Sequence, residues 1–189
     1  MHRLIDKAIE EFLRVSYGDA LHDAVTQAVA KAVDLPTEAG MHDNIRIHVA
    51  ARRLAKPVEE LFEDLGAWLA RQEPIRRLLR FSGRQFAEFV MRLHELPGRA
   101  HMILPDIGMP AIYVTECSIG DLRVILPDAE TGWTALLAGM LRVMADDYGA
   151  LVLISVEGNQ IGVLIPDADF AAGRDFELGA AFYSGGVGA

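Results

Sequence analysis

The sequence predicts an α+β fold in which an N-terminal helical part is followed by an antiparallel sheet of about four strands crossed by one helix. Apolar residues recur at helical spacing from the N-terminus to Leu96. After Pro110 they fall instead in short runs rich in β-branched residues. Helices and strands therefore occupy separate parts of the chain, as they do in α+β domains.

The first half of the chain predicts helices in succession. The first is expected over residues 2–15, where Ile5, Ile9 and Phe12 recur on one face. Further helices are predicted over the ranges 20–33, 44–55, 57–70 and 74–80. The next helix carries Phe86, Phe89, Val90, Leu93 and Leu96 on its apolar positions. Pro97-Gly98 is expected to stop or kink it, because proline lacks the amide donor and clashes with the preceding turn.

The second half predicts two strand pairs with a helix between them. Ala111–Cys117 and Leu122–Leu126 form the first pair. Leu151–Glu157 and Gln160–Ile165 form the second, and Gly158-Asn159 suits a two-residue hairpin turn. The helix is predicted over about 130–148, ends before Gly149, and has its apolar face at Trp133, Leu136, Leu137, Met140, Leu141 and Met144.

The length, charge and composition of the chain limit the kinds of function it can have. With 189 residues, 51% of them hydrophobic, the chain is long enough to bury a sizeable core in one domain. We assign residues 1–166 to this domain and 167–189 to a Gly/Ala-rich C-terminal tail. The net charge of −9 argues against nucleic acid and anionic membranes as partners. No apolar run suits a membrane span or a signal peptide, so a cytoplasmic location is expected.

Reactive side chains do not form a recognisable catalytic pattern. Cys117 is the single cysteine, which excludes an intrachain disulfide and a cysteine-based metal site. It lies on a predicted strand beside Glu116, whose charge disfavours a thiolate, so a buried and inert thiol is expected. No nucleophile–base pair, paired carboxylates, phosphate-binding loop or metal site emerges. We therefore predict that the chain is not an enzyme.

Several motifs resemble those of haem–nitric oxide/oxygen binding (H-NOX) domains, and in particular a divergent stand-alone bacterial member. The run Phe89–Pro97, followed by Pro105 and Pro110, is similar to the proximal helix of that family, which reads roughly FLxNLDxLH and precedes further prolines. Three other motifs resemble the family's YGD, PEELLExFG and LLRxxG in order and spacing: Tyr17-Gly18-Asp19, Pro57–Gly66 and Leu78–Gly83. The match covers residues 1 to about 165 and implies the H-NOX fold.

The family's haem-binding residues are replaced in this chain. H-NOX domains hold haem b through a proximal histidine and bind its propionates with a YxSxR motif. Aligned without a gap, the histidine position is Pro97, and the three clamp positions are Leu126, Asp128 and Glu130. Two carboxylates facing two propionates repel, whereas an arginine would bind them. Without a clamp function, Asp128 is expected to cap the next helix, and Glu130 to lie in its first turn.

His94 is the alternative haem ligand near the replaced position. It precedes Pro97 by three residues, so on a helix it lies about 4.5 Å back along the axis and about 60° around it. Its imidazole would reach the iron only if the helix slid or the haem tilted. Otherwise His94 is a helix residue without a metal role. His101, beyond the proline, is the second candidate of this kind.

The resemblance also implies an apolar cleft, and the residues at its lining positions are apolar. These residues are Ile5, Ile9, Phe12, Trp68, Leu69, Phe86, Phe89, Val90, Leu136 and Met140. Without a porphyrin between them, such side chains either pack as core or surround another apolar ligand.

Three hypotheses about function follow. The first is an H-NOX-like signalling or sensor domain that is free of haem and acts through a protein partner. The resemblance implies a histidine kinase or a cyclic-di-GMP enzyme as that partner. The second hypothesis is a haem-based NO or O₂ sensor with altered ligation through His94. The third is a binder of another apolar small molecule in the inherited cleft.

Overall fold

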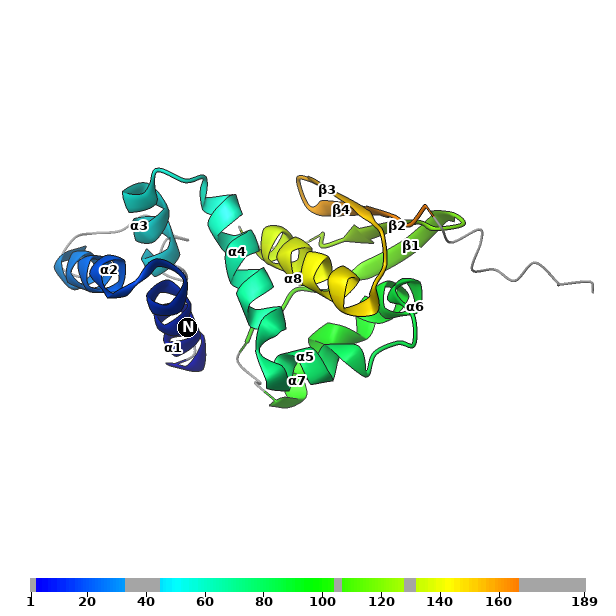
Figure 1. Ribbon diagram of the computed structural model, residues 1–189, viewed down its shortest axis with the longest axis horizontal. Coiled ribbons are helices and arrows are strands. Elements are labelled where there is room, and N and C mark those ends of the chain that lie inside the picture. Colours follow the sequence, from blue (N-terminus) through cyan, green and yellow to red (C-terminus); the bar gives the residue numbers. More distant parts are fainter. Residues whose placement is uncertain (1–2, 33–44, 104–106, 128–131, 167–189) are drawn as a thin grey trace, which may run out of the picture.

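The computed structural model describes residues 3–32, 45–103, 107–127 and 132–166. The molecule is elongated and has two lobes (Figure 1). The N-terminal lobe contains α1 (Arg3–Tyr17), α2 (Asp19–Ala32) and α3 (Ile45–Leu54). Two longer helices, α4 (Val58–Arg71) and α8 (Trp133–Tyr148), pack against each other where the lobes meet.

The C-terminal lobe is built on a four-stranded antiparallel sheet in the order β1-β2-β4-β3. Its strands are β1 (Tyr113–Ser118), β2 (Asp121–Ile125), β3 (Leu153–Glu157) and β4 (Gln160–Leu164). One face packs on α8 through Leu122, Val124, Ile161 and Val163, which are all buried. The remaining helical elements of the lobe are α5 (Glu73–Arg80), α6 (Phe86–Met91), the 3₁₀ helix η1 (Arg92–Glu95) and α7 (Leu96–Ile103).

The predicted fold class is confirmed: helices precede a four-stranded antiparallel sheet, and α8 separates its two hairpins. The start of α8 differs from the prediction. The helix begins at Trp133, and Gly132, with φ of 102°, is its N-cap. The prediction that Asp128 caps this helix and that Glu130 lies in its first turn is therefore wrong, and both residues lie outside the described ranges. A Cβ at Gly132 would lie 2.5 Å from the Phe62 ring, so close packing on α4 accompanies the late start.

Pro97 does not end the helical segment. It is the second residue of α7, which continues to Ile103, so of the two expectations, a stop or a kink, the stop is wrong. The regular α-helix is instead interrupted by η1 just before Pro97. The amide that proline lacks is one of the first-turn groups that have no partner inside a helix, and proline is therefore tolerated there. The change of direction is taken up by η1, immediately before α7.

Cys117 is exposed, so the prediction of a buried thiol is wrong. It lies on β1, which is at one margin of the sheet. The pairing of β1 with β2 is irregular between Glu116 and Ser118, on either side of this cysteine. A marginal strand with a bulge has few neighbours to cover its side chains.

Buried apolar residues form two clusters, one in each lobe. The N-terminal cluster includes Ile9, Phe12, Ile47 and Leu61. The C-terminal cluster joins the sheet to α6, η1 and α8, and Leu126, Phe89 and Leu141 are among its fully buried members. Leu136 of α8 packs against both clusters. The two cores are therefore joined through the contact of α4 with α8.

Two glycines allow α4 and α8 to approach closely. A Cβ at Gly66 would lie 1.9 Å from the carbonyl oxygen of Leu136, and a Cβ at Gly139 would lie 2.0 Å from that of Glu63. Either position occupied by alanine would therefore force the helices apart. The ion pair between Arg142 and Glu63, at 2.6 Å, spans the same two helices.

A polar cluster ties the end of α1 to α4. The Tyr17 hydroxyl donates to Asp64 Oδ2 at 2.6 Å, and Lys56 Nζ donates to the same oxygen at 2.9 Å. The Lys56 ammonium also lies 5.8 Å from the centre of the Tyr17 ring. Burial, reinforced by the hydrogen bond to Asp64, raises the pKa of Tyr17 to about 12. The hydrogen bond to Asp64 also raises the pKa of Lys56.

Gly139→Ala is expected to destabilise the protein by about 2 kcal/mol or more, because overpacking of the helix contact outweighs the gain in helix propensity. Gly98→Ala is the matched control, since it also lies in a helix and a Cβ there would meet nothing within 4 Å. The control is expected to keep or slightly raise stability. Denaturant unfolding of both variants measures the difference, and equal stability would contradict the close contact.

The Tyr17 cluster predicts a loss of stability at alkaline pH. Because its pKa is higher in the folded state than the ordinary value of about 10, folding favours the protonated phenol. This contribution is complete below about pH 10 and is lost as the pH rises through about 12. Denaturant unfolding across that pH range is expected to show a smaller loss of unfolding free energy in Tyr17→Phe than in the wild-type protein. The contribution of the raised pKa of Lys56 remains in this variant. The ultraviolet absorbance difference between the wild-type protein and Tyr17→Phe should show the Tyr17 phenol ionising near about pH 12; ionisation near about pH 10 would contradict the assignment.

Candidate functional site

The candidate site is the segment from α6 to α7, where the aligned haem-ligand position lies. Pro97 is half-buried in the first turn of α7. Its side chain consists of methylene groups and has no atom that can coordinate a metal. Leu93 and Leu96 flank it on the buried side and belong to the core of the C-terminal lobe. The inward face of this segment is therefore apolar.

Neither nearby histidine faces the core. His94 is exposed, and its Nδ1 lies 2.8 Å from the Met91 carbonyl oxygen, to which it must donate because a carbonyl only accepts. His101, on α7, is also exposed. Within the described ranges, no three His, Cys, Asp or Glu side chains lie close enough together to hold a metal ion.

Leu126 is the described member of the three clamp positions. It follows β2, has no exposed surface and packs in the core beneath the sheet. Its amide donates to the Asn159 carbonyl oxygen at 3.0 Å, which extends the contact between β2 and the β3–β4 turn. A fully buried aliphatic side chain here has a packing role and offers no donor to a propionate.

The predicted cleft-lining residues divide between the two lobes. Ile9, Phe12, Trp68 and Leu69 belong to the N-terminal cluster, and Ile5 lies in α1 with a side chain outside the described set. Phe86, Phe89, Val90 and Met140 belong to the C-terminal cluster, and Leu136 is the one described residue of this set that packs against both. Two surface hollows occur elsewhere, beside the sheet and at the α3–α4 corner, and neither is lined by these residues.

An aromatic cluster that the sequence did not reveal supports α6 from the side of α8. The Tyr148 ring stacks on Phe89, with 5.7 Å between ring centres, and meets the Phe86 ring edge-on. Its hydroxyl donates to the Gly83 carbonyl oxygen at 2.9 Å, while the Arg80 guanidinium lies 3.7 Å from its ring centre. Tyr148 is at the end of the helix predicted from the sequence, but its partners lie at least 59 residues away, so no local pattern identifies them.

A second set of polar contacts fixes α7. Arg99 donates to the Ser82 hydroxyl at 2.6 Å and forms an ion pair with Glu95. Ser82 is buried and is in the turn that follows α5. These contacts join α7 and η1 to the end of α5, so the position of the segment is set by protein groups on several sides.

The fold is that of H-NOX proteins. "Cs H-NOX", carrying an unnatural 4-cyano-phenylalanine at site 5, matches with a TM-score of 0.70 and 13% identity over 88% of this chain and 97% of that one. An H-NOX protein from S. oneidensis, in its Fe(II)NO ligation state, gives 0.69 and 14% over 87% and 98%. The I5F mutant of the T. tengcongensis H-NOX gives 0.69 and 12% over 88% and 98%.

Sequence comparison adds no closer relative: no protein-family model and no curated protein matches. The three structures share their architecture with this chain. At 12–14% identity the match concerns the fold alone. Because the match covers nearly the whole of each solved chain, it includes both lobes and the α6–α7 segment. The chain therefore has an H-NOX-like fold, as its sequence motifs predicted.

Proposed function

We propose that this chain is a signalling domain with an H-NOX-like fold that does not use haem and acts through a protein partner. One observation carries the proposal: Pro97 occupies the haem-ligand position, in a helix whose inward neighbours Leu93 and Leu96 are buried core residues. A haem iron needs a donor atom on its proximal side. The residues present at this position do not fit haem.

The clamp positions support the same conclusion. Leu126 is buried in the core, so this position contributes no hydrogen-bond donor. Asp128 and Glu130 are acidic where the family binds two carboxylates. Like charges at close range repel, and the repulsion grows when they are withdrawn from water. Ligand and clamp are separate requirements, and both are unmet.

Contacts within the chain hold the α6–α7 segment in place, which favours a retained role for the domain. Tyr148 packs α8 on Phe86 and Phe89 of α6, and Arg99 joins α7 to Ser82. These contacts are made by side chains and carbonyl groups of the chain itself. A domain of this kind can present a fixed surface to another protein.

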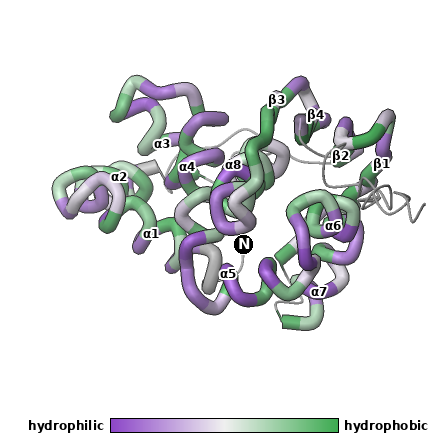
Figure 2. Tube along the Cα trace, turned by 45° about the vertical axis from the view of Figure 1, so that its right-hand side comes forward, coloured by the Kyte–Doolittle hydropathy of each residue, from purple (hydrophilic) through white to green (hydrophobic). Residues whose placement is uncertain are grey.

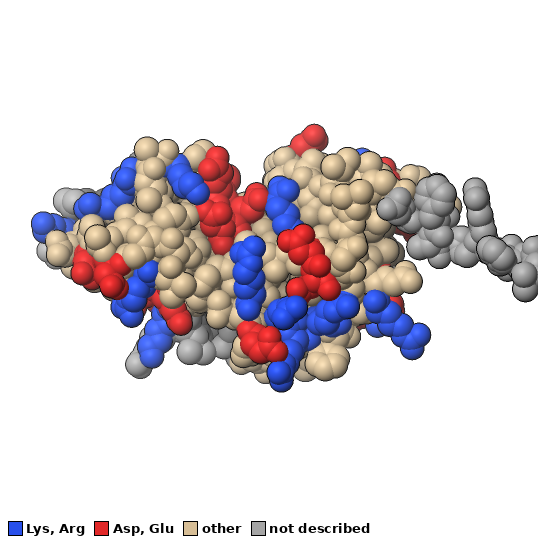
Figure 3. Space-filling view, in the orientation of Figure 1, with Lys and Arg blue, Asp and Glu red and all other residues tan. Residues whose placement is uncertain are grey.

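The kind of partner comes from the family resemblance, which implies a histidine kinase or a cyclic-di-GMP enzyme. On the face seen in Figure 3, acidic and basic side chains are interspersed. The described surface also carries ion pairs, such as Arg142 with Glu63 and Arg76 with Asp147, at 2.6 Å each. Such a mixed surface suits recognition of a protein better than binding to a polyanion. Among the described helices, none has the length and apolar character of a membrane span.

Titration of the purified full chain with hemin is expected to give no saturable Soret band, because Pro97 supplies no ligand to iron. The absorption spectrum measures this, both after the titration and after expression with a haem precursor. Stoichiometric haem in the wild-type protein would overturn the proposal. If that band disappeared in His94→Ala, the alternative of altered ligation would replace it.

Pro97→His is expected to introduce haem binding, because it restores a donor at the aligned ligand position. Combining it with Asp128→Ser and Glu130→Arg should strengthen binding further, since the charge at the clamp is reversed. The matched control carries Asp128→Ser and Glu130→Arg but retains Pro97, and should bind no haem. Circular dichroism confirms folding of each variant. Equal binding by the control and by the variant with histidine would show that Pro97 does not decide haem loss.

A further inference from the structure

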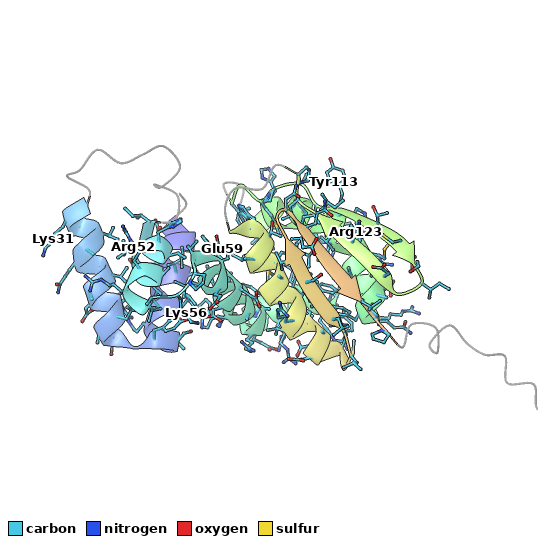
Figure 4. The ribbon with its side chains drawn as sticks, turned by 90° about the horizontal axis from the view of Figure 1, so that it is seen from above. Lys31, Arg52, Lys56, Glu59, Tyr113 and Arg123 are labelled. Atoms are coloured by element: carbon cyan, nitrogen blue, oxygen red, sulfur yellow. The ribbon has the colours of Figure 1, made fainter. Side chains whose placement is uncertain are left out.

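One face of the sheet packs on α8, and the other face, called the outer face below, is not buried. Inner positions of β2 and β4, such as Val124 and Ile161, have no exposed surface. Successive side chains of a strand point to opposite faces. The described side chains at the alternate, outer positions are all exposed or half-buried. Figure 4 shows the sheet from above, with Tyr113 and Arg123 labelled on the outer face.

Apolar side chains lie on the outer face, although the solvated face of an antiparallel sheet is ordinarily polar. Leu153 is 64% exposed and Leu164 is 42% exposed, and the two pair directly with each other across β3 and β4. Tyr113, on β1, is 58% exposed. Figure 2 shows β3 as a largely hydrophobic strand at the limit of the sheet. Apolar groups gathered on one exposed face favour contact with another protein.

A hollow of about 530 Å³ opens on the same face. Most of its lining comes from outer positions of β2, β4 and β3. In the register of these strands, Gly162 lies between Arg123 and Ser155, so the middle strand has no side chain in this row. A Cβ at Gly162 would lie 2.7 Å from Ser155 Oγ. Bare backbone therefore forms part of the floor, between two polar side chains.

The charges around the hollow define what would complement it. Arg123 has no ion pair or hydrogen bond among the described residues, whereas Arg142, which also lines the hollow, pairs with Glu63. Asp121 and Glu157 belong to the lining too, one outer row to either side of Arg123. A partner with an acidic side chain opposite Arg123 and basic side chains on both sides of it matches this pattern.

The size of the outer face decides between a second copy of the chain and a single helix. Four strands about 4.8 Å apart and about five residues long cover roughly 300 Å² in projection. Each partner of a standard interface buries about 800 Å² of accessible surface, so this face is small for a stable dimer. An α-helix of about 11 residues is about 17 Å long, which is the length of the strands, and about 10 Å wide.

We propose that the outer face binds an amphipathic helix of the protein partner, which lies along β4 over Gly162. The inference rests on the proposed function and names the docking surface for it. Residues i and i+4 of a helix are about 6.0 Å apart along its axis, close to the spacing of about 6.8 Å between outer positions of a strand. One apolar side chain of the helix thus contacts Leu164, the next enters the hollow, and an acidic side chain reaches Arg123.

Photocrosslinking of the full chain in its source cells tests the proposal. Photoreactive benzoylphenylalanine takes the place of Tyr113, which is on the outer face but does not line the hollow. The expected result is an adduct with a protein whose crosslinked segment is an amphipathic helix containing Asp or Glu. Arg123→Glu reverses the central charge and Gly162→Tyr fills the hollow, and each should reduce the adduct about tenfold or more.

The matched control is Arg53→Glu, which makes the same change of charge at an exposed arginine of α3 and should leave the yield of adduct unchanged. Circular dichroism confirms that each variant is folded. The photoreactive residue is also placed at Val15, which is exposed on α1 in the other lobe, to detect docking elsewhere.

Adducts from Val15 without any from Tyr113 would overturn this docking site and leave the proposed function standing. Absence of a protein adduct from both positions would count against the docking site and the proposed function together. Crosslinking within the chain, or to a second copy of it, would assign another occupant to the outer face and overturn the proposal. An adduct whose yield neither Arg123→Glu nor Gly162→Tyr lowers would overturn it as well.

Discussion

The close contact between α4 and α8 is the constraint on which the rest of the structure depends. Each lobe has its own apolar cluster, and Leu136 is the residue of α8 that packs on both. Gly66 and Gly139 each place bare backbone against a carbonyl oxygen of the other helix. Two helices that approach this closely cannot slide, because neighbouring side chains would collide with backbone. The lobes are therefore positioned by helix packing.

The segment that aligns with the family's ligand and clamp positions is held by core packing in this chain. The inward face of the α6–α7 segment is closed by Leu93 and Leu96, and Leu126 closes the end of β2. Tyr148 and Arg99 then secure the segment with hydrogen bonds. Burial of aliphatic side chains at these positions favours folding by about 2 kcal/mol each. The C-terminal lobe is thus stabilised at the aligned ligand and clamp positions by its own side chains.

Periodicity in the sequence was sufficient to predict the four strands and every described α-helix except α7, because each pattern is local. The errors arose where distant contacts decide the outcome. Pro97 was expected to stop a helix, but η1 takes up the change of direction and leaves proline in a tolerated first turn. Cys117 was expected to be buried, but the bulge and marginal position of β1 expose it. The contacts of Tyr148 and Arg99 link residues far apart in sequence, so the spacing gave no signal for them.

The motifs that resemble the H-NOX family have packing roles in this chain, and this separates fold from cofactor. Gly66 ends the motif that begins at Pro57, and a side chain there would meet Leu136. Gly83 ends the next motif, and a Cβ there would lie 2.5 Å from the Phe89 amide nitrogen. Tyr17 donates to Asp64. None of these contacts involves the aligned ligand or clamp positions, so a chain can make all of them whichever residue stands at position 97. Resemblance in such motifs therefore predicts the fold reliably, whereas haem binding has to be judged at the ligand and clamp positions themselves.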